Sequence, residues 1–157
     1  MPQSIASTLV LGFGNPHRGD DGIGVRVAEA LAANPLPEDV EVVDGGTQGL
    51  GVVPLLEGRK RLIVVDAAKL GHEPGAYRRF ALSEARFLGT DNHIAIHEAG
   101  LREALLLAEV LGYLPQDTVF YGIQPASLKW EENLSVPVSK ALEQVTKMIR
   151  AELQRDS

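Results

Sequence analysis

Three residues that lie far apart in the sequence, Asp21, Asp66 and His97, have side chains that could together bind a divalent metal ion. Two carboxylates and one imidazole can hold Zn²⁺ or Ni²⁺ and leave coordination positions open for water or a substrate. The sequence contains no cysteine, so a metal must be bound by His, Asp or Glu. Each residue also has a structural alternative: Asp21 as a helix cap, Asp66 as an acceptor for nearby backbone amides and His97 as a turn residue.

A further acid, Asp44, is followed by Gly45, Gly46 and Thr47. The two glycines allow a peptide or a metal site to approach the backbone closely. The same four residues are equally typical of a simple glycine turn in which the threonine caps a short helix. Both interpretations stay open at this point.

Four other polar residues near these positions are weaker candidates. His17 fits a residue at the rim of a site or an exposed loop histidine, and His72 falls in a predicted turn exposed to solvent. His93 lies in a segment whose structure the sequence does not indicate. Asp20 neighbours Asp21 at a predicted helix start, where the helix dipole favours negative charge, so one of this pair can be purely structural.

Several common catalytic motifs are absent. The dinucleotide-binding pattern that begins at Gly12 needs a third glycine where the sequence has His17. The zinc-protease pattern that begins at His97 needs a second histidine where it has Leu101. The phosphate-binding loop of ATPases and the serine elbow of α/β hydrolases are missing as well. We therefore interpret Gly12 and Gly14 as residues for turn geometry and close helix packing.

The elements that must position these residues alternate between strands and helices. The aliphatic run at 62–66 is uninterrupted, which favours a central strand covered on both faces. Polar insertions at 76–82 favour an edge strand, and the short turn before it predicts that it runs antiparallel to its predecessor. Predicted strands cover residues 8–13, 40–44, 62–66, 76–82 and 118–123, and predicted helices cover 23–31, 50–56, 101–111 and 138–153.

This alternation predicts an α/β fold, a three-layer α/β/α sandwich around a mixed five-stranded sheet with one antiparallel strand. In such sheets the carboxyl ends of the parallel strands hold the ligand site. Asn15, Asp44 and Asp66 fall at or just after such ends, so topology brings them to one edge. We also expect helix caps, which are Asp20 or Asp21 for the first helix, Thr47 for the second and Ser135 for the last.

Length and composition predict one domain over residues 1–157, in which residues 1–7 can be flexible. The net charge of −6, with no long basic run, argues against nucleic acid as a partner. No apolar stretch approaches the roughly 20 residues that cross a bilayer, and the first residues do not resemble a signal peptide. We therefore expect a cytoplasmic protein without a membrane partner.

The stretch at 12–24, GFGNPHRGDDGIG, resembles the signature of the nickel–iron hydrogenase maturation proteases, which trim the C-terminus of the hydrogenase large subunit. Later stretches resemble the family's later blocks, in the same order. The resemblance runs from about residue 8 to the last predicted helix and so covers a whole domain. These later stretches are DGGT at 44–47, LIVVDA at 62–67, HEAGL at 97–101 and GIQP at 122–125.

The resemblance implies that Asp21, Asp66 and His97 correspond to the family's metal-binding trio, and that the fourth strand of the sheet is the antiparallel one. It also implies that the metal is nickel and comes with the substrate. Nickel already inserted into the large-subunit precursor would be recognised, and its presence would permit cleavage. Zinc or cadmium could occupy the same site.

For the reaction itself, we expect Asp21 or Asp66 to activate the attacking water, with Asp44 as the reserve candidate for the base. The predicted substrate-binding residues are Gly45, Gly46 and Thr47. The protein is expected to act on the precursor as a monomer. Two alternatives remain: a non-catalytic sensor of nickel occupancy or chaperone in hydrogenase assembly, and an unrelated metal-dependent peptidase for small peptides.

Overall fold

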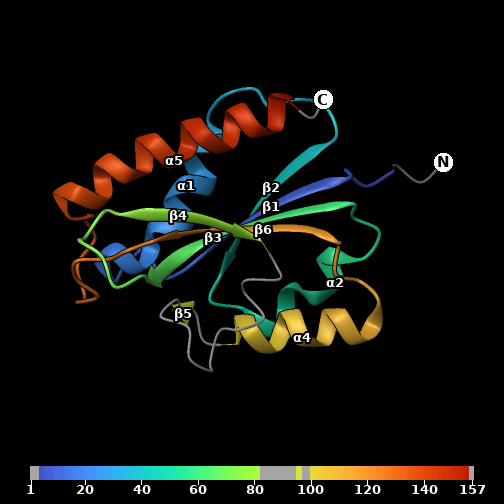
Figure 1. The fold of residues 1–157 in the computed structure, drawn as a ribbon, viewed down its shortest axis with the longest axis horizontal. Coiled ribbons are helices and arrows are strands. Elements are labelled where there is room, and N and C mark those ends of the chain that lie inside the picture. Colours follow the sequence, from blue (N-terminus) through green and yellow to red (C-terminus); the bar gives the residue numbers. More distant parts are fainter. Residues whose placement is uncertain (1–3, 82–94, 97–99, 156–157) are drawn as a thin grey trace.

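A β-sheet runs through the middle of the protein, and helices cover both of its faces (Figure 1). The computed structural model describes residues 4–81, 95–96 and 100–155. Within them, the main strands have the order β2-β1-β3-β6-β4, and the short strand β5 pairs with β3 off this path. The strands are β1 (Thr8–Phe13), β2 (Val40–Gly46), β3 (Arg61–Lys69), β4 (Tyr77–Ala81), β5 (Ala95–Ile96) and β6 (Asp117–Ile123). The predicted mixed five-stranded sheet is confirmed.

The helices form the two outer layers. Figure 1 shows α1 and α5 on one face of the sheet and α2 and α4 on the other. The α-helices are α1 (Ile23–Ala32), α2 (Val53–Leu56), α4 (Leu101–Leu111) and α5 (Val136–Arg155), and the 3-10 turns are η1 (Gly19–Gly22) and η2 (Gly49–Val52). In the described ranges, no helix combines the length and the apolar character needed to span a membrane.

Strand β3 is the centre of the sheet because both of its faces are apolar. Eight of its nine residues are buried. Leu62 and Val64 pack into the core beneath α2 and α4, whereas Ile63 and Val65 pack into the core beneath α1 and α5. Alternate side chains of a strand point to opposite faces, so an uninterrupted aliphatic run is buried on both sides. The predicted central position is confirmed.

Strand β4 lies at the edge of the sheet and is the antiparallel strand, as predicted. It pairs with β6, which lies between β4 and β3. Arg78 and Arg79 are exposed on it, whereas Phe80 is buried and stacks on Phe120 of β6, with 5.2 Å between the ring centroids. An edge strand needs only one buried face, which explains its polar insertions.

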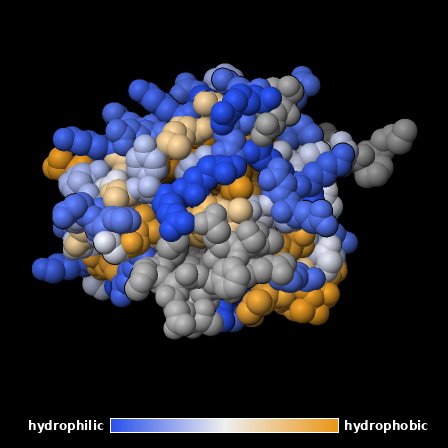
Figure 2. All heavy atoms as spheres, viewed as in Figure 1, coloured by the Kyte–Doolittle hydropathy of each residue, from blue (hydrophilic) through white to orange (hydrophobic). Residues whose placement is uncertain are grey.

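Helix α4 is apolar on two sides. Its inner side contributes Leu101, Ala104, Leu105 and Ala108 to the core. Leu111, the last residue of the helix, is about half exposed. Figure 2 shows an apolar patch over α4, and the exposed apolar residues of the helix are Leu106, Leu107, Val110 and Leu111.

The helix caps expected at Asp20 or Asp21 and at Thr47 are not found, whereas Ser135 directly precedes α5 as predicted. No side-chain hydrogen bond caps η1 or α1, where Asp20 or Asp21 was expected. The segment after β2 begins at Gly49 with Gln48 before it, so Thr47 does not cap it either. Ser135 precedes α5 and accepts from the Ser139 amide through its carbonyl oxygen, while its hydroxyl donates to Asp20. The prediction treated these polar residues as local caps, whereas the side chain of Asp20 binds a segment more than a hundred residues away.

Candidate active site

Asp21 lies in η1, the turn that connects the loop after β1 to helix α1, and its side chain is 3% exposed. One carboxylate oxygen accepts a hydrogen bond of 2.9 Å from the backbone amide of Asn15. The Asp21 amide donates in turn to the carbonyl of Arg18 at 3.1 Å. These bonds fold residues 15–21 into a tight loop that holds the carboxylate in a fixed place.

Glycines allow this loop to approach the strands. At Gly14, where φ is 125°, a Cβ would lie 1.8 Å from the carbonyl oxygen of Asp21. At Gly24, a Cβ would lie 2.2 Å from the carbonyl oxygen of Val65, which directly precedes Asp66. Only glycine permits both approaches. A Cβ on Gly12 would likewise lie 2.1 Å from the carbonyl oxygen of Gly24 in α1, so the interpretation of Gly12 and Gly14 as residues for turn geometry and close helix packing is confirmed. The contact at Gly24 places the start of α1, directly after the turn of Asp21, against β3.

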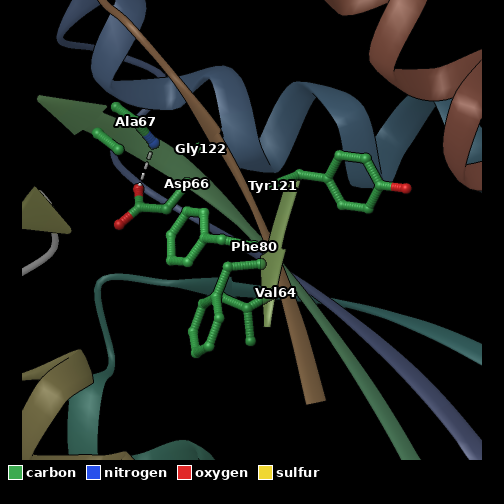
Figure 3. A pocket seen from close by; sticks show the side chains of 8 residues that line it. Val64, Asp66, Ala67, Phe80, Tyr121 and Gly122 are labelled. Carbon is green, nitrogen blue, oxygen red and sulfur yellow. Dashed lines mark hydrogen bonds between the residues drawn. The ribbon is translucent and has the colours of Figure 1, made fainter. Parts of the chain in front are cut away.

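Asp66 lies near that end of β3 and is 4% exposed. One of its carboxylate oxygens accepts a 2.8 Å hydrogen bond from the Ala67 amide, and Figure 3 shows the other oxygen pointing away from this amide. The sequence-based alternative, an acceptor for nearby amides, is therefore also seen here. Burying a carboxylate is costly unless it is hydrogen-bonded or near a cation, so this placement has to be maintained by its surroundings.

A small pocket lies beside Asp66, between β3, β6 and β4 (Figure 3). Gly122 of β6 pairs with Asp66 in the sheet, and a Cβ on Gly122 would lie 2.8 Å from the Cβ of Ala68. The glycine therefore keeps the space next to the carboxylate open. Phe80 lines the pocket on the same side, whereas Tyr121 points to the opposite face of the sheet. From the sequence, Gly122 was noted only within the stretch that resembles the family, although a glycine inside an apolar strand is a signal for close approach of a neighbouring group.

His97, the third residue of the predicted trio, lies outside the described residues. The strand before it is described: in β5, Ile96 pairs with Ala68 and Ala95 pairs with Lys69, antiparallel to β3. The backbone of Ile96 thus pairs with β3 two residues beyond Asp66. This pairing was not anticipated from the sequence, because two residues are too few to show a periodic pattern.

Asp44, near the end of β2, is exposed, and it accepts a 2.7 Å hydrogen bond from the amide of Gly46. Gly46 has a φ of 51°, and its carbonyl accepts from the Gly14 amide at 2.9 Å. A Cβ on Gly45 would meet the ring of Phe13 at 2.8 Å. The segment is therefore a glycine turn, and it is tied to the loop that carries Asp21.

Asp20 has a structural role that the sequence did not reveal. Its side chain is 1% exposed and accepts hydrogen bonds from the amides of Ala126, Ser127 and Ser135 and from the Ser135 hydroxyl. It thereby fastens the segment between β6 and α5 to the loop of Asp21. No local pattern could have indicated partners so distant in the chain.

The remaining histidines do not join the site. His17 and His72 are exposed, as expected for loop and turn histidines, and His93 lies outside the described residues. Within residues 4–81, 95–96 and 100–155, no three His, Asp or Glu side chains are grouped to hold a metal ion. The predicted trio is a separate matter, because His97 lies outside these ranges.

The arrangement gathers two buried carboxylates and a glycine turn at the carboxyl edge of the parallel strands, where α/β proteins bind ligands. Carboxylates bind divalent cations, and they accept protons from water during hydrolysis. The chemistry of these two carboxylates is therefore compatible with binding a divalent cation or with accepting a proton.

Comparisons with known proteins point in the same direction. A family model described as hydrogenase maturation protease matches residues 25–152. The hydrogenase expression/formation protein HupD of Bradyrhizobium diazoefficiens is 41% identical over 133 residues, which cover 83% of this chain and 69% of that protein. The hydrogenase 2 maturation protease of Escherichia coli is 34% identical over 148 residues, which cover 93% of this chain and 90% of that protein.

The fold is also similar to solved structures. The hydrogenase maturating endopeptidase HybD from Escherichia coli superposes with a TM-score of 0.84 at 32% sequence identity. The superposition covers 96% of this chain and 93% of that chain. The similarity therefore extends over the whole sheet and both helical layers.

Proposed function

This chain belongs to the hydrogenase maturation protease family, and we propose that it removes the C-terminal extension of a nickel–iron hydrogenase large-subunit precursor after nickel has been inserted. The family makes the chain a hydrolase, an endopeptidase of hydrogenase maturation. The nickel dependence and the roles of individual residues belong to the proposal.

One observation supports the proposal above the others. Gly24, at the start of α1 and three residues after Asp21, packs closely against the carbonyl of Val65, which directly precedes Asp66. Two buried acids from segments 45 residues apart in sequence are thereby brought to one edge of the sheet. Burial of such charges is unfavourable for folding alone and becomes useful when a cation is delivered to them.

In this account nickel is part of the substrate, carried by the precursor. Asp21, Asp66 and His97 would contribute ligands when the precursor docks, and zinc or cadmium could take the same position. The two carboxylates also attract a cation electrostatically. A precursor without nickel would lack this anchoring, so nickel insertion would become the condition for cleavage.

The reaction is a hydrolysis in which the oxygen of water attacks the peptide carbonyl and the amide nitrogen leaves with a proton. Asp21 or Asp66 would accept the proton of the attacking water, and the cation would stabilise the negative charge that develops on the carbonyl oxygen. Asp44 is the reserve candidate for the base. The turn formed by Gly45, Gly46 and Thr47 would lie along the substrate peptide.

Incubation of the purified protein with nickel-loaded and nickel-free precursor tests the proposal. We expect the loaded precursor to lose its extension, which a mobility shift on a gel and intact-mass measurement would detect, and the nickel-free precursor to stay intact. One site in each chain suffices for this reaction, so we expect a monomer to be active.

Equal cleavage of the two precursors would contradict the nickel dependence while leaving the endopeptidase activity in place. Absence of cleavage of both would contradict the proposed substrate. Restoring nickel to the nickel-free precursor controls for damage during its preparation, because it should restore cleavage.

A further inference from the structure

A single exposed aromatic residue stands next to the loop of Asp21. Trp130 is the only tryptophan in the sequence, and it is 75% exposed. It belongs to the segment between β6 and α5, and none of the candidate site residues lies in this segment. Exposed tryptophan is unfavourable in water, and tryptophan is among the residues most enriched at the energetic centres of interfaces.

The ring is held in place by Arg18. The guanidinium of Arg18 lies 5.6 Å from the centroid of the Trp130 ring, within the range of a cation–π contact. Its Nε also donates to the carbonyl of Leu128 at 3.2 Å. Arg18 thus contacts this segment at two residues, Leu128 and Trp130.

The backbone around Trp130 is fixed to the same loop. The Glu131 amide donates to the carbonyl of His17 at 2.9 Å, and the Gly19 amide donates to the carbonyl of Glu131 at 2.7 Å. Asp20 holds the segment on both sides through its four hydrogen bonds to residues 126–127 and Ser135. The tryptophan is therefore presented on an ordered backbone, which lowers the entropy lost when a partner binds it.

The connection to the candidate active site is short. Arg18, which contacts the ring, accepts the backbone hydrogen bond of Asp21 at 3.1 Å. A polypeptide that places its nickel against Asp21 must continue across neighbouring surface, and Trp130 lies on the segment joined to this loop. The surrounding residues carry both charge signs, Arg18 and Lys129 against Glu131 and Glu132. The charges balance, so the apolar ring is the feature of this surface that a partner would recognise.

From these contacts we infer that Trp130 is a specificity-determining residue that binds an apolar side chain of the precursor polypeptide next to its nickel-bearing segment. The inference rests on the proposed function and adds a binding contact to it. Trp130 supplies docking energy, and Arg18 orients its ring. The chemical step itself needs neither of them.

The kinetics of the variant Trp130→Ala with nickel-loaded precursor test this assignment. Loss of a tryptophan at the centre of an interface typically costs enough to raise KM by about tenfold or more, and kcat should stay close to that of the original protein. Trp130→Phe keeps an aromatic face and should recover most of the loss. Ile5→Ala, a truncation of an exposed apolar residue just before β1, should leave both constants unchanged.

Fluorine NMR gives an independent readout, because protein labelled with fluorotryptophan carries its label at Trp130 alone. We expect this resonance to shift when excess nickel-loaded precursor keeps the protein saturated, and to return when the precursor is consumed.

A KM for Trp130→Ala within twofold of the original, or a resonance that the precursor does not move, would overturn the inference while cleavage by the original protein upholds the proposed function. A loss confined to kcat would also overturn it, because it would assign the ring to the chemical step or the fold. If the original protein does not cleave the loaded precursor at all, the proposed function fails, and this inference fails with it.

Discussion

Asp21, Asp66 and Asp44 lie at the same edge of the sheet but in different environments. Asp21 and Asp66 are almost fully buried, and backbone amides donate hydrogen bonds to both carboxylates. Asp44 is exposed, and its hydrogen bond to Gly46 closes its own turn. Burial strengthens the interaction of a carboxylate with a cation because the surrounding dielectric is low. At the residue scale, burial therefore favours Asp21 and Asp66 over Asp44 for contact with the metal that we propose the substrate carries.

The substitutions Asp21→Asn and Asp66→Asn should each lower the cleavage rate of nickel-loaded precursor by about 100-fold or more, because a neutral amide binds nickel weakly and cannot accept the proton of water. Asp44→Asn should stay within about tenfold of the original rate, since it mainly affects a turn. Single-turnover cleavage followed by intact mass measures all three.

Thermal unfolding of each variant is the control, because asparagine keeps the shape of aspartate and should preserve the fold. If Asp44→Asn were as inactive as Asp66→Asn at equal stability, the base would be Asp44. Full activity of Asp66→Asn would remove that residue from the site.

The sequence predicted Asp21 and Asp66 as candidates because each follows a recognisable strand, and their burial agrees with that prediction without testing their chemistry. It could not predict the role of Asp20. Asp20 and Asp21 are adjacent residues of the same type, so the sequence does not distinguish them. Only folding brings residues 126–135 to Asp20. The cap expected at Thr47 was wrong because the turn after β2 is built from glycine conformations and the hydrogen bond of Asp44.

Among the elements, α5 is attached to the sheet by a buried charged group. Glu152 of α5 is 4% exposed and accepts hydrogen bonds from Arg61, Arg79 and Tyr121, which come from β3, β4 and β6. Burial alone would raise the pKa of Glu152, but the hydrogen bonds from Arg79 and Tyr121 and the charges of the two arginines hold it below its ordinary value. Burial and the hydrogen bond to Glu152 raise the pKa of Tyr121 in turn.

The variant Glu152→Gln should lower the free energy of unfolding at neutral pH by about 3 kcal/mol, because it removes the buried negative charge that Arg61 and Arg79 both contact, while Arg61 keeps its 3.5 Å ion pair with Asp117. The folded-state pKa of Glu152 lies below its ordinary value of 4.5, so its contribution is complete above that value and is lost as the pH falls below it. The difference between the two proteins should therefore be largest near pH 7 and shrink below about pH 4.5. Urea unfolding at several pH values measures it.

Glu143→Gln is the matched control, since Glu143 is exposed on the same helix. It should change stability by less than about 0.5 kcal/mol at every pH. A loss for Glu152→Gln that stays constant from pH 7 to pH 3 would show that packing, not charge, holds α5 in place.

The elements themselves were predicted well where apolar periodicity was strong. The uninterrupted run of β3 predicted its central position, and the polar residues of β4 predicted an antiparallel edge strand. Periodicity fails for β5, which is too short to have a pattern. It also fails at the exposed end of α4, where Leu111 continues an apolar spacing that the core does not use.

At the scale of the whole molecule, the topology places the site. Strands β2, β1, β3 and β6 are parallel, so their carboxyl ends share one edge, and the segments that follow β1 and β2 meet there. Sequence alone indicated this edge, because alternating strands and helices predict parallel strands whose carboxyl ends hold the ligand site. It could not give the distances between side chains, which depend on the close packing at Gly14, Gly24 and Gly122.

We propose that Asp21, Asp66 and His97 converge to bind a divalent ion. A crystal of this protein can be soaked with cadmium or nickel and measured at the absorption edge of the metal. We expect an anomalous peak bound by these three side chains at the carboxyl edge of β1 and β3. A metal bound elsewhere, with the three side chains too far apart to bind one ion, would show that the proposed site is wrong.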